Sequence, residues 1–69
     1  MNNLKISVII PCYNEEKTIE KIIEQVSING DMIHEIIIID DNSTDRSKEI
    51  ITDISKKNSK IIFHFKDKN

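Results

Sequence analysis

Several kinds of residue and segment are missing from this 69-residue sequence, and their absence excludes whole classes of protein. Cys12 is the only cysteine, so an internal disulfide is impossible and a reducing compartment is favoured. No apolar run approaches the roughly 20 residues that span a bilayer. The amino terminus also lacks the apolar stretch and cleavage site of a signal peptide. We therefore predict a soluble, cytoplasmic chain with no transmembrane segment.

A strong excess of one charge is absent as well, because 10 basic residues face 12 acidic ones and the formal net charge is −2. This balance argues against a nucleic-acid partner. Lysines are frequent near the carboxyl terminus, but acidic and polar residues stand among them. We interpret these lysines as a solvated surface rather than as a phosphate or membrane contact. They are Lys56, Lys57, Lys60, Lys66 and Lys68.

The most informative stretch that is present consists of four consecutive isoleucines, at positions 36–39, followed directly by Asp40 and Asp41. Consecutive β-branched apolar side chains are typical of a strand that is buried on both faces. A polar and acidic segment continues to Asp45. Open α/β sheets bind ligands at the carboxyl ends of their strands. This stretch therefore predicts a fold class and a site together.

Strands and helices are predicted to alternate along the chain. The strands cover residues 4–10, which Pro11 ends, then about 33–40 and 60–65. The first helix begins at an Asn14 cap, and its apolar residues recur at i, i+3, i+4 and i+7 from Ile19. The second helix is capped by Ser43 or Thr44. The order β-α-β-α-β predicts an α/β fold, half of a Rossmann-like domain with a parallel three-stranded sheet.

The predicted topology leaves one face of the sheet without cover. Parallel crossovers are right-handed in nearly all cases, so a sheet that grows in one direction carries both helices on one face. The isoleucine strand nevertheless suits a sheet with two covering layers. We expect either self-association through the uncovered face or edge, or a longer protein. Because the sequence stops at Asn69 directly after a strand, we favour a truncated domain over residues 1–69.

Two segments whose side chains could bind a ligand or take part in a reaction follow the first and second strands. They should therefore meet at one end of the sheet. Residues 11–15 read Pro-Cys-Tyr-Asn-Glu, and residues 40–45 read Asp-Asp-Asn-Ser-Thr-Asp. Tyr13 offers a flat ring to a nucleobase, and Asp41 offers a carboxylate to a base N–H. The first helix's amino terminus can accept negative charge, although Glu15 competes there. Together these groups suit a base and ribose.

The two segments, in this order and about 25 residues apart (on the scale of a βαβ unit), resemble the amino-terminal end of the family 2 inverting glycosyltransferases of GT-A fold. The likeness is greatest to the branch with dolichyl-phosphate mannosyltransferase and bacterial polyprenyl-phosphate glycosyltransferases. It implies a sugar-nucleotide site formed by Pro11, Tyr13, Glu15, Ile39 and Asp41. Ile39 would act through its backbone. Asp40 would support the loop.

The sequence departs from the family pattern in two places and lacks two of its parts. Asn42 stands where the family usually has Gly, but asparagine tolerates a left-handed backbone. Arg46 and Ser47 replace a common Gly-Thr pair. The family's metal-binding Asp-x-Asp motif and catalytic base would lie further on, so we predict no catalytic residue and no metal ligand here.

The resemblance extends to partners and cofactors of the full-length enzyme. It implies a UDP- or GDP-linked sugar, a divalent metal (Mg or Mn) that this chain alone does not hold, and a polyprenyl-phosphate acceptor. It also implies a location at the cytoplasmic face of the membrane. The isolated chain is then an inactive donor-binding segment.

Other interpretations of the same residues stay open. One is a receiver-like regulatory domain, although its acidic pair would follow the first strand rather than the second. Another is a non-catalytic interaction module that self-associates. Cys12 is interpreted as a small residue beneath the loop, and His34 and His64 as surface or strand-end residues. Phe63 and Phe65 are interpreted as one face of the last strand.

Overall fold

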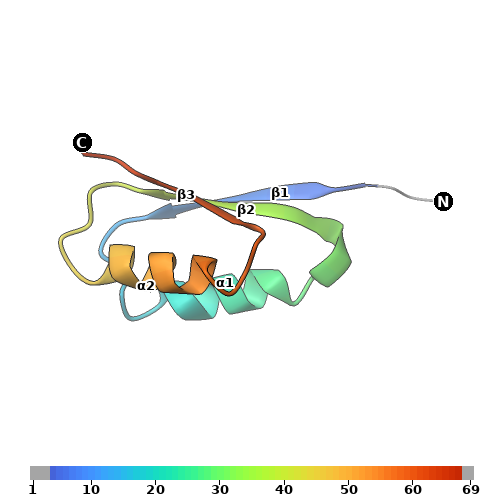
Figure 1. Ribbon diagram of the computed structural model, residues 1–69, viewed down its shortest axis with the longest axis horizontal. Coiled ribbons are helices and arrows are strands. Elements are labelled where there is room, and N and C mark those ends of the chain that lie inside the picture. Colours follow the sequence, from blue (N-terminus) through green and yellow to red (C-terminus); the bar gives the residue numbers. More distant parts are fainter. Residues whose placement is uncertain (1–3, 68–69) are drawn as a thin grey trace.

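The computed structural model describes residues 4–67, so Lys68 and Asn69 lie outside the described residues. The chain alternates strands with helices, in the order predicted, and a short 3-10 helix η1 precedes the second strand (Figure 1). The elements are β1 (Ile6–Cys12), α1 (Ile19–Ser27), η1 (Gly30–Met32), β2 (Ile33–Asp40), α2 (Ser47–Ser55) and β3 (Ile61–Phe65).

The three strands form one parallel sheet in the order β1-β2-β3. Cys12 pairs with Asp40, and Asp40 pairs with Phe65, at the carboxyl end of each strand. The predicted α/β class with a parallel three-stranded sheet is therefore confirmed. Because the register aligns the three strand ends, the segments that follow them start side by side.

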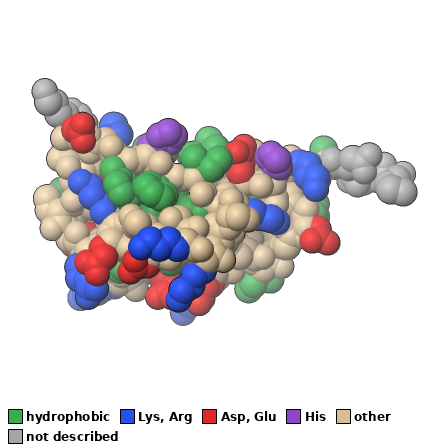
Figure 2. All heavy atoms as spheres, viewed as in Figure 1, with side chains coloured by type: hydrophobic (Ala, Val, Ile, Leu, Met, Phe, Trp, Pro, Cys, Tyr) green, Lys and Arg blue, Asp and Glu red, His purple; other side chains and the backbone are tan. Residues whose placement is uncertain are grey.

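Both helices lie on the same face of the sheet, as expected from right-handed crossovers (Figure 1). Ile36 and Ile38 of β2 point to this face and are fully buried. The buried core contains mainly isoleucines from all five main elements: Ile10, Ile19, Ile23, Ile33, Ile36, Ile38, Ile51 and Ile61, with Cys12. Charged side chains of both signs cover the helical layer (Figure 2).

The opposite face of the sheet carries apolar side chains that no layer of the described residues 4–67 covers. Ile9 of β1 is 63% exposed and Ile62 of β3 is 42% exposed. Between them, Ile37 and Ile39 of β2 are partly exposed. The alternation of a strand sends successive side chains to opposite faces, so the isoleucine run is divided between core and surface. Within residues 4–67, neither helix has the length and apolar character needed to cross a bilayer.

The boundaries of two strands differ from the sequence prediction. β1 runs from Ile6 to Cys12, so it starts later than Leu4 and continues through Pro11. Pro11 does not end the strand because β1 lies at the edge of the sheet and pairs only with β2. A proline whose missing N–H faces away from the ladder is tolerated at an edge. β3 begins at Ile61, one residue later than predicted.

Shortening a core isoleucine should cost more stability than shortening a surface one. Ile38→Val removes one buried methyl group, and we expect it to lower the free energy of unfolding by about 0.5–1.5 kcal/mol. Ile9→Val makes the same chemical change at a side chain that is 63% exposed, so its effect should be smaller. Urea unfolding followed by circular dichroism measures both. Equal losses in the two variants would contradict the arrangement of the core.

Candidate functional site

Two loops leave the carboxyl end of the sheet, and side-chain hydrogen bonds join them. The first loop comprises residues 13–18 and the second loop residues 41–46. The Asn14 N–H donates to Ser43 Oγ at 2.8 Å. Asn14 Oδ1 in turn accepts the N–H groups of Thr44 at 2.8 Å and Asp45 at 3.3 Å. Asn14 therefore connects the loops and does not cap α1, which corrects the sequence prediction.

Side chains of the second loop and of the start of α2 also bind the backbone of the first loop. Ser47 Oγ accepts the Glu15 N–H at 2.8 Å, and Asp45 Oδ2 accepts the Glu16 N–H at 3.1 Å. Both N–H groups precede α1, which begins at Ile19 and whose N-cap Thr18 makes no side-chain capping bond, so these contacts hold the first loop rather than cap the helix.

Asp45 also sets the start of α2, where Ser43 or Thr44 was predicted to act. Its Oδ1 accepts the Ser47 N–H at 2.8 Å. Partial burial alone would raise the pKa of the Asp45 carboxyl, but hydrogen bonds from Ser47 and from the backbone of Glu16 hold the pKa below its usual range. The ionised carboxylate is therefore the form that joins the first loop to the start of α2.

Asp40 is fully buried beneath the second loop, whereas Asp41 lies at the surface. Asp40 Oδ2 accepts the Ser43 N–H at 2.8 Å, and Asp40 Oδ1 accepts a hydrogen bond from Ser43 Oγ. The two adjacent carboxylates thus have different surroundings, and Asp40 holds the loop. Asn42 follows with φ +61°, which is the left-handed conformation. This conformation was expected where the family usually has Gly, because asparagine tolerates it.

Cys12 lies buried beside Asp40 and Ser47. Burial raises the pKa of its thiol, and the neighbouring Asp40 carboxylate raises it further, against an opposing hydrogen bond with Ser47. A thiol whose pKa is raised supplies little thiolate at neutral pH, so it is not an activated nucleophile. This agrees with the interpretation of Cys12 as a packing residue.

A cleft of about 440 Å³ opens beside these loops at the carboxyl end of the sheet. All five residues that the resemblance assigns to a sugar-nucleotide site line this one cleft. Tyr13 stands at its rim with 51% of its surface exposed. The lining residues are Pro11, Cys12, Tyr13, Glu15, Ile39, Asp41 and Lys66.

Lys66 is the lining residue that sequence reasoning missed, because it was interpreted as part of a solvated surface. Its ammonium nitrogen lies 3.4 Å from Asp41 Oδ1. The Lys66 N–H donates to the Asp40 carbonyl oxygen at 2.9 Å, and the Asp41 N–H donates to the Cys12 carbonyl oxygen at 2.8 Å. Lys66 could have been identified from its position directly after β3, because this position places it at the same end of the sheet as Asp41.

The described residues do not suit a divalent metal ion by themselves. Among residues 4–67, no group of three or more His, Cys, Asp or Glu side chains is placed to hold one. The cleft offers the carboxylates of Glu15 and Asp41, and Asp41 already pairs with Lys66. Magnesium and calcium ions prefer six or more oxygen ligands, so further oxygens would have to come from elsewhere.

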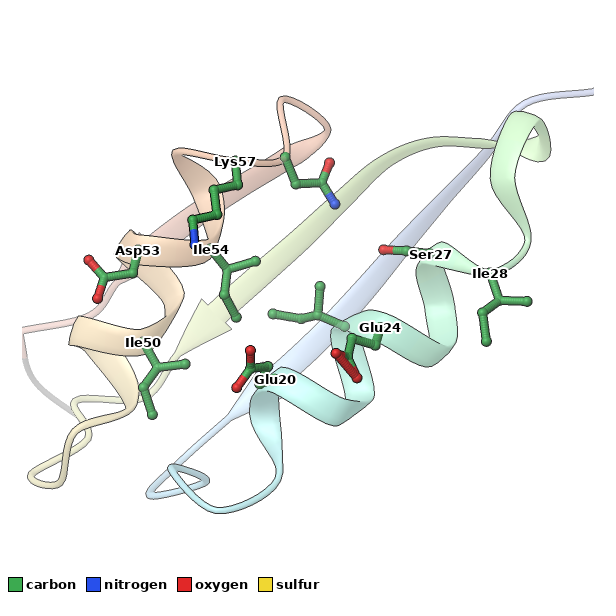
Figure 3. A pocket seen from close by; sticks show the side chains of 10 residues that line it. Glu20, Glu24, Ser27, Ile28, Ile50, Asp53, Ile54 and Lys57 are labelled. Carbon is green, nitrogen blue, oxygen red and sulfur yellow. The ribbon is translucent and has the colours of Figure 1, made fainter.

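A second depression, of about 530 Å³, lies between α1 and α2 and away from the loops (Figure 3). Ile50 and Ile54 of α2 and Ile23 of α1 form its apolar part. The carboxylates of Glu20 and Glu24 point toward it from α1 (Figure 3). No residue implied by the resemblance lines this groove.

The cleft lies at the carboxyl end of a parallel α/β sheet, which is where open sheets of this class bind their ligands. The model of the family described as "Glycosyl transferase family 2" matches residues 7–69. The chain belongs to this family, which confirms the resemblance stated from the sequence. Family membership also sets aside the receiver-like interpretation.

Relatives include the undecaprenyl-phosphate 4-deoxy-4-formamido-L-arabinose transferase of Yersinia enterocolitica, which is 39% identical over 51 residues. The dolichol-phosphate mannosyltransferase of Pyrococcus furiosus is 38% identical over 56 residues. An uncharacterised glycosyltransferase of Rickettsia conorii is 46% identical over 68 residues. These alignments cover 70%, 78% and 97% of this chain, but only 16%, 16% and 11% of the relatives. The chain thus spans a small part of their length.

Removing the charge of Asp45 should destabilise the protein in a pH-dependent way. Because folding lowers the pKa of this carboxyl, its contribution is complete above the unfolded pKa of about 4 and disappears as the pH falls through the folded pKa. Asp45→Asn should therefore unfold at lower urea than the wild type at pH 7, and the gap should narrow toward pH 3. Asp53→Asn, at an exposed position of α2, is the matched control. A gap that does not depend on pH would contradict this role.

Proposed function

We propose that this chain is the donor-binding segment of a glycosyltransferase that transfers a sugar from a nucleotide-sugar to a polyprenyl phosphate. The observation that carries the proposal is the cleft, which gathers Pro11, Tyr13, Glu15, Ile39 and Asp41 at the carboxyl end of the sheet. Membership of glycosyl transferase family 2 supports the reaction class. The names of two relatives, an undecaprenyl-phosphate transferase and a dolichol-phosphate mannosyltransferase, support the acceptor class.

In this proposal the cleft holds the base and ribose of a UDP- or GDP-linked sugar. The half-exposed ring of Tyr13 stacks on the base, and the carboxylate of Asp41 accepts a hydrogen bond from a base N–H. Pro11 and the backbone of Ile39 form the adjoining wall. Glu15 faces the ribose, and its orientation is held by the Thr18 hydroxyl, which donates to Glu15 Oε2 at 2.6 Å.

The remaining parts of the reaction are proposed to lie outside this chain. The family generally uses a divalent metal ion, and in a longer enzyme this ion would bind the donor phosphates with the help of further carboxylates. The catalytic base would also come from elsewhere. The isolated chain is then a binding segment without turnover. The enzyme would work at the cytoplasmic face of a membrane, where a polyprenyl phosphate is anchored.

Nucleotide titration tests the cleft. UDP or GDP, added at millimolar concentration, should shift the NMR signals of Tyr13 and Asp41. Tyr13→Ala should weaken binding roughly fivefold to a hundredfold, because a base–aromatic stack contributes about 1–3 kcal/mol. Ile28→Ala removes an 81% exposed side chain from the end of α1 and should change nothing. Unchanged signals around Tyr13 and Asp41 with both nucleotides would refute the cleft as a donor site.

We further propose that the isolated chain self-associates through the uncovered face of the sheet. Ile9 is 63% exposed and Ile62 is 42% exposed on this face, with the partly exposed Ile37 and Ile39 between them. Burial of such side chains contributes about 25 cal/mol per Å² of apolar surface removed from water. The outer edges of β1 and β3 also present unpaired backbone groups that can template pairing.

A charge placed on this face should prevent the association. The wild type should sediment as a concentration-dependent oligomer, whereas Ile9→Lys should shift the distribution to monomer, because burying an unpaired ammonium is costly. Ile28→Lys adds the same charge at an exposed position of the helical layer and should leave the oligomer intact. A wild-type chain that remains monomeric at every concentration would rule out this proposal.

A further inference from the structure

Lys66 brings a cation next to the carboxylate that is proposed to contact the base. Its backbone is fixed at the end of β3, since its N–H donates to the Asp40 carbonyl oxygen at 2.9 Å. Its ammonium nitrogen lies 3.4 Å from Asp41 Oδ1. The side chains of Lys66 and Asp41 are 51% and 47% exposed. A ligand in the cleft can therefore reach both charged groups.

The two groups are chemically complementary to one kind of base edge. The carboxylate is a hydrogen-bond acceptor and the ammonium beside it is a donor. Uracil and guanine present a ring N–H beside a carbonyl oxygen, which is the matching pattern. Cytosine and adenine present the reverse, a ring nitrogen acceptor beside an amino group. A carboxylate has about four acceptor sites and an ammonium has three donors.

We infer that Lys66 and Asp41 together read the base of the donor nucleotide and select uracil or guanine against cytosine and adenine. This inference rests on the proposed function, because it requires the base to lie against Asp41. Asp41 accepts the ring N–H, and Lys66 donates to the neighbouring carbonyl oxygen. With cytosine or adenine, the ammonium would face an amino group and the carboxylate would face a ring lone pair. Both contacts are repulsive, and repulsion of this kind is an effective source of specificity.

The other residues of the cleft do not supply this discrimination. Stacking on Tyr13 is available to every base, because each base has an aromatic face. Pro11 and Ile39 contribute apolar surface or backbone. Glu15 is a further acceptor, and among the described residues that line the cleft Lys66 is the only cation. The donor in the edge contact is therefore assigned to Lys66.

The test compares four nucleoside diphosphates that differ only in the base. UDP, GDP, CDP and ADP are titrated into the wild type and into Lys66→Met, with affinities taken from NMR shifts. The wild type should bind UDP or GDP roughly tenfold more tightly than CDP and ADP. This factor is near the low end of the discrimination that a two-bond base contact provides, because the Lys66–Asp41 pair is half-exposed. Lys66→Met should lose most of this preference, because its affinity for the preferred nucleotide should fall. Lys66→Arg, which keeps a donor, should retain the preference.

Lys56→Met is the matched control, because it removes the same charge from an exposed position after α2 and should leave the preference unchanged. If Lys66→Met lowered the affinity for all four nucleotides equally, Lys66 would be a general phosphate contact, and this result would overturn base selection. A wild type that binds all four equally would also overturn it, while the donor cleft itself would stand. Absence of binding by all four would refute the proposed function and the inference with it.

Discussion

The side-chain hydrogen bonds between the first and second loops are the constraint on which the rest of the site depends. Asn14 holds the second loop through Thr44 and Asp45, while Ser47 and Asp45 hold the backbone of the first loop. Each loop therefore has its shape only in the presence of the other. Tyr13 and Asp41, which line the cleft, are the residues next to these contacts, so the network fixes the cleft as well.

The difference between Asp40 and Asp41 shows how the fold gives neighbouring identical residues separate tasks. Strand alternation sends Asp40 into the protein, where Ser43 satisfies its carboxylate, and leaves Asp41 at the surface beside Lys66. A buried carboxylate with hydrogen-bonding partners is a structural element. A half-exposed one within reach of a cleft can exchange partners with a ligand. The distinction depends on one step along the chain.

Local patterns in the sequence were sufficient to predict the helices and strands, but they were insufficient to predict the side-chain contacts between them. The isoleucine strand, residues 33–40, was predicted at its observed bounds because β-branched runs and their polar stop are local signals. Asn14 was assigned to the wrong role because its actual partners, Thr44 and Asp45, lie about 30 residues away. Lys66 was missed for the same reason, since only the sheet register brings it to Asp41. The five implied cleft residues came from the family pattern, which contains such long-range information.

The hydrogen bonds between the two loops also have a consequence for how the chain folds. The partners of Asn14, Glu15 and Glu16 lie 29 to 32 residues further along, so these bonds form only after β2 and the second loop have docked. Contacts of long sequence separation are entropically costly to close and tend to slow folding. The pairing of β1 with β2, from Ile6 with Ile33 to Cys12 with Asp40, spans a similar separation, so the cleft and the sheet depend on the same long-range docking. During synthesis, a chain that has emerged only as far as β2 would lack the second loop, α2 and β3, so the first loop would have none of these partners and the cleft would be incomplete.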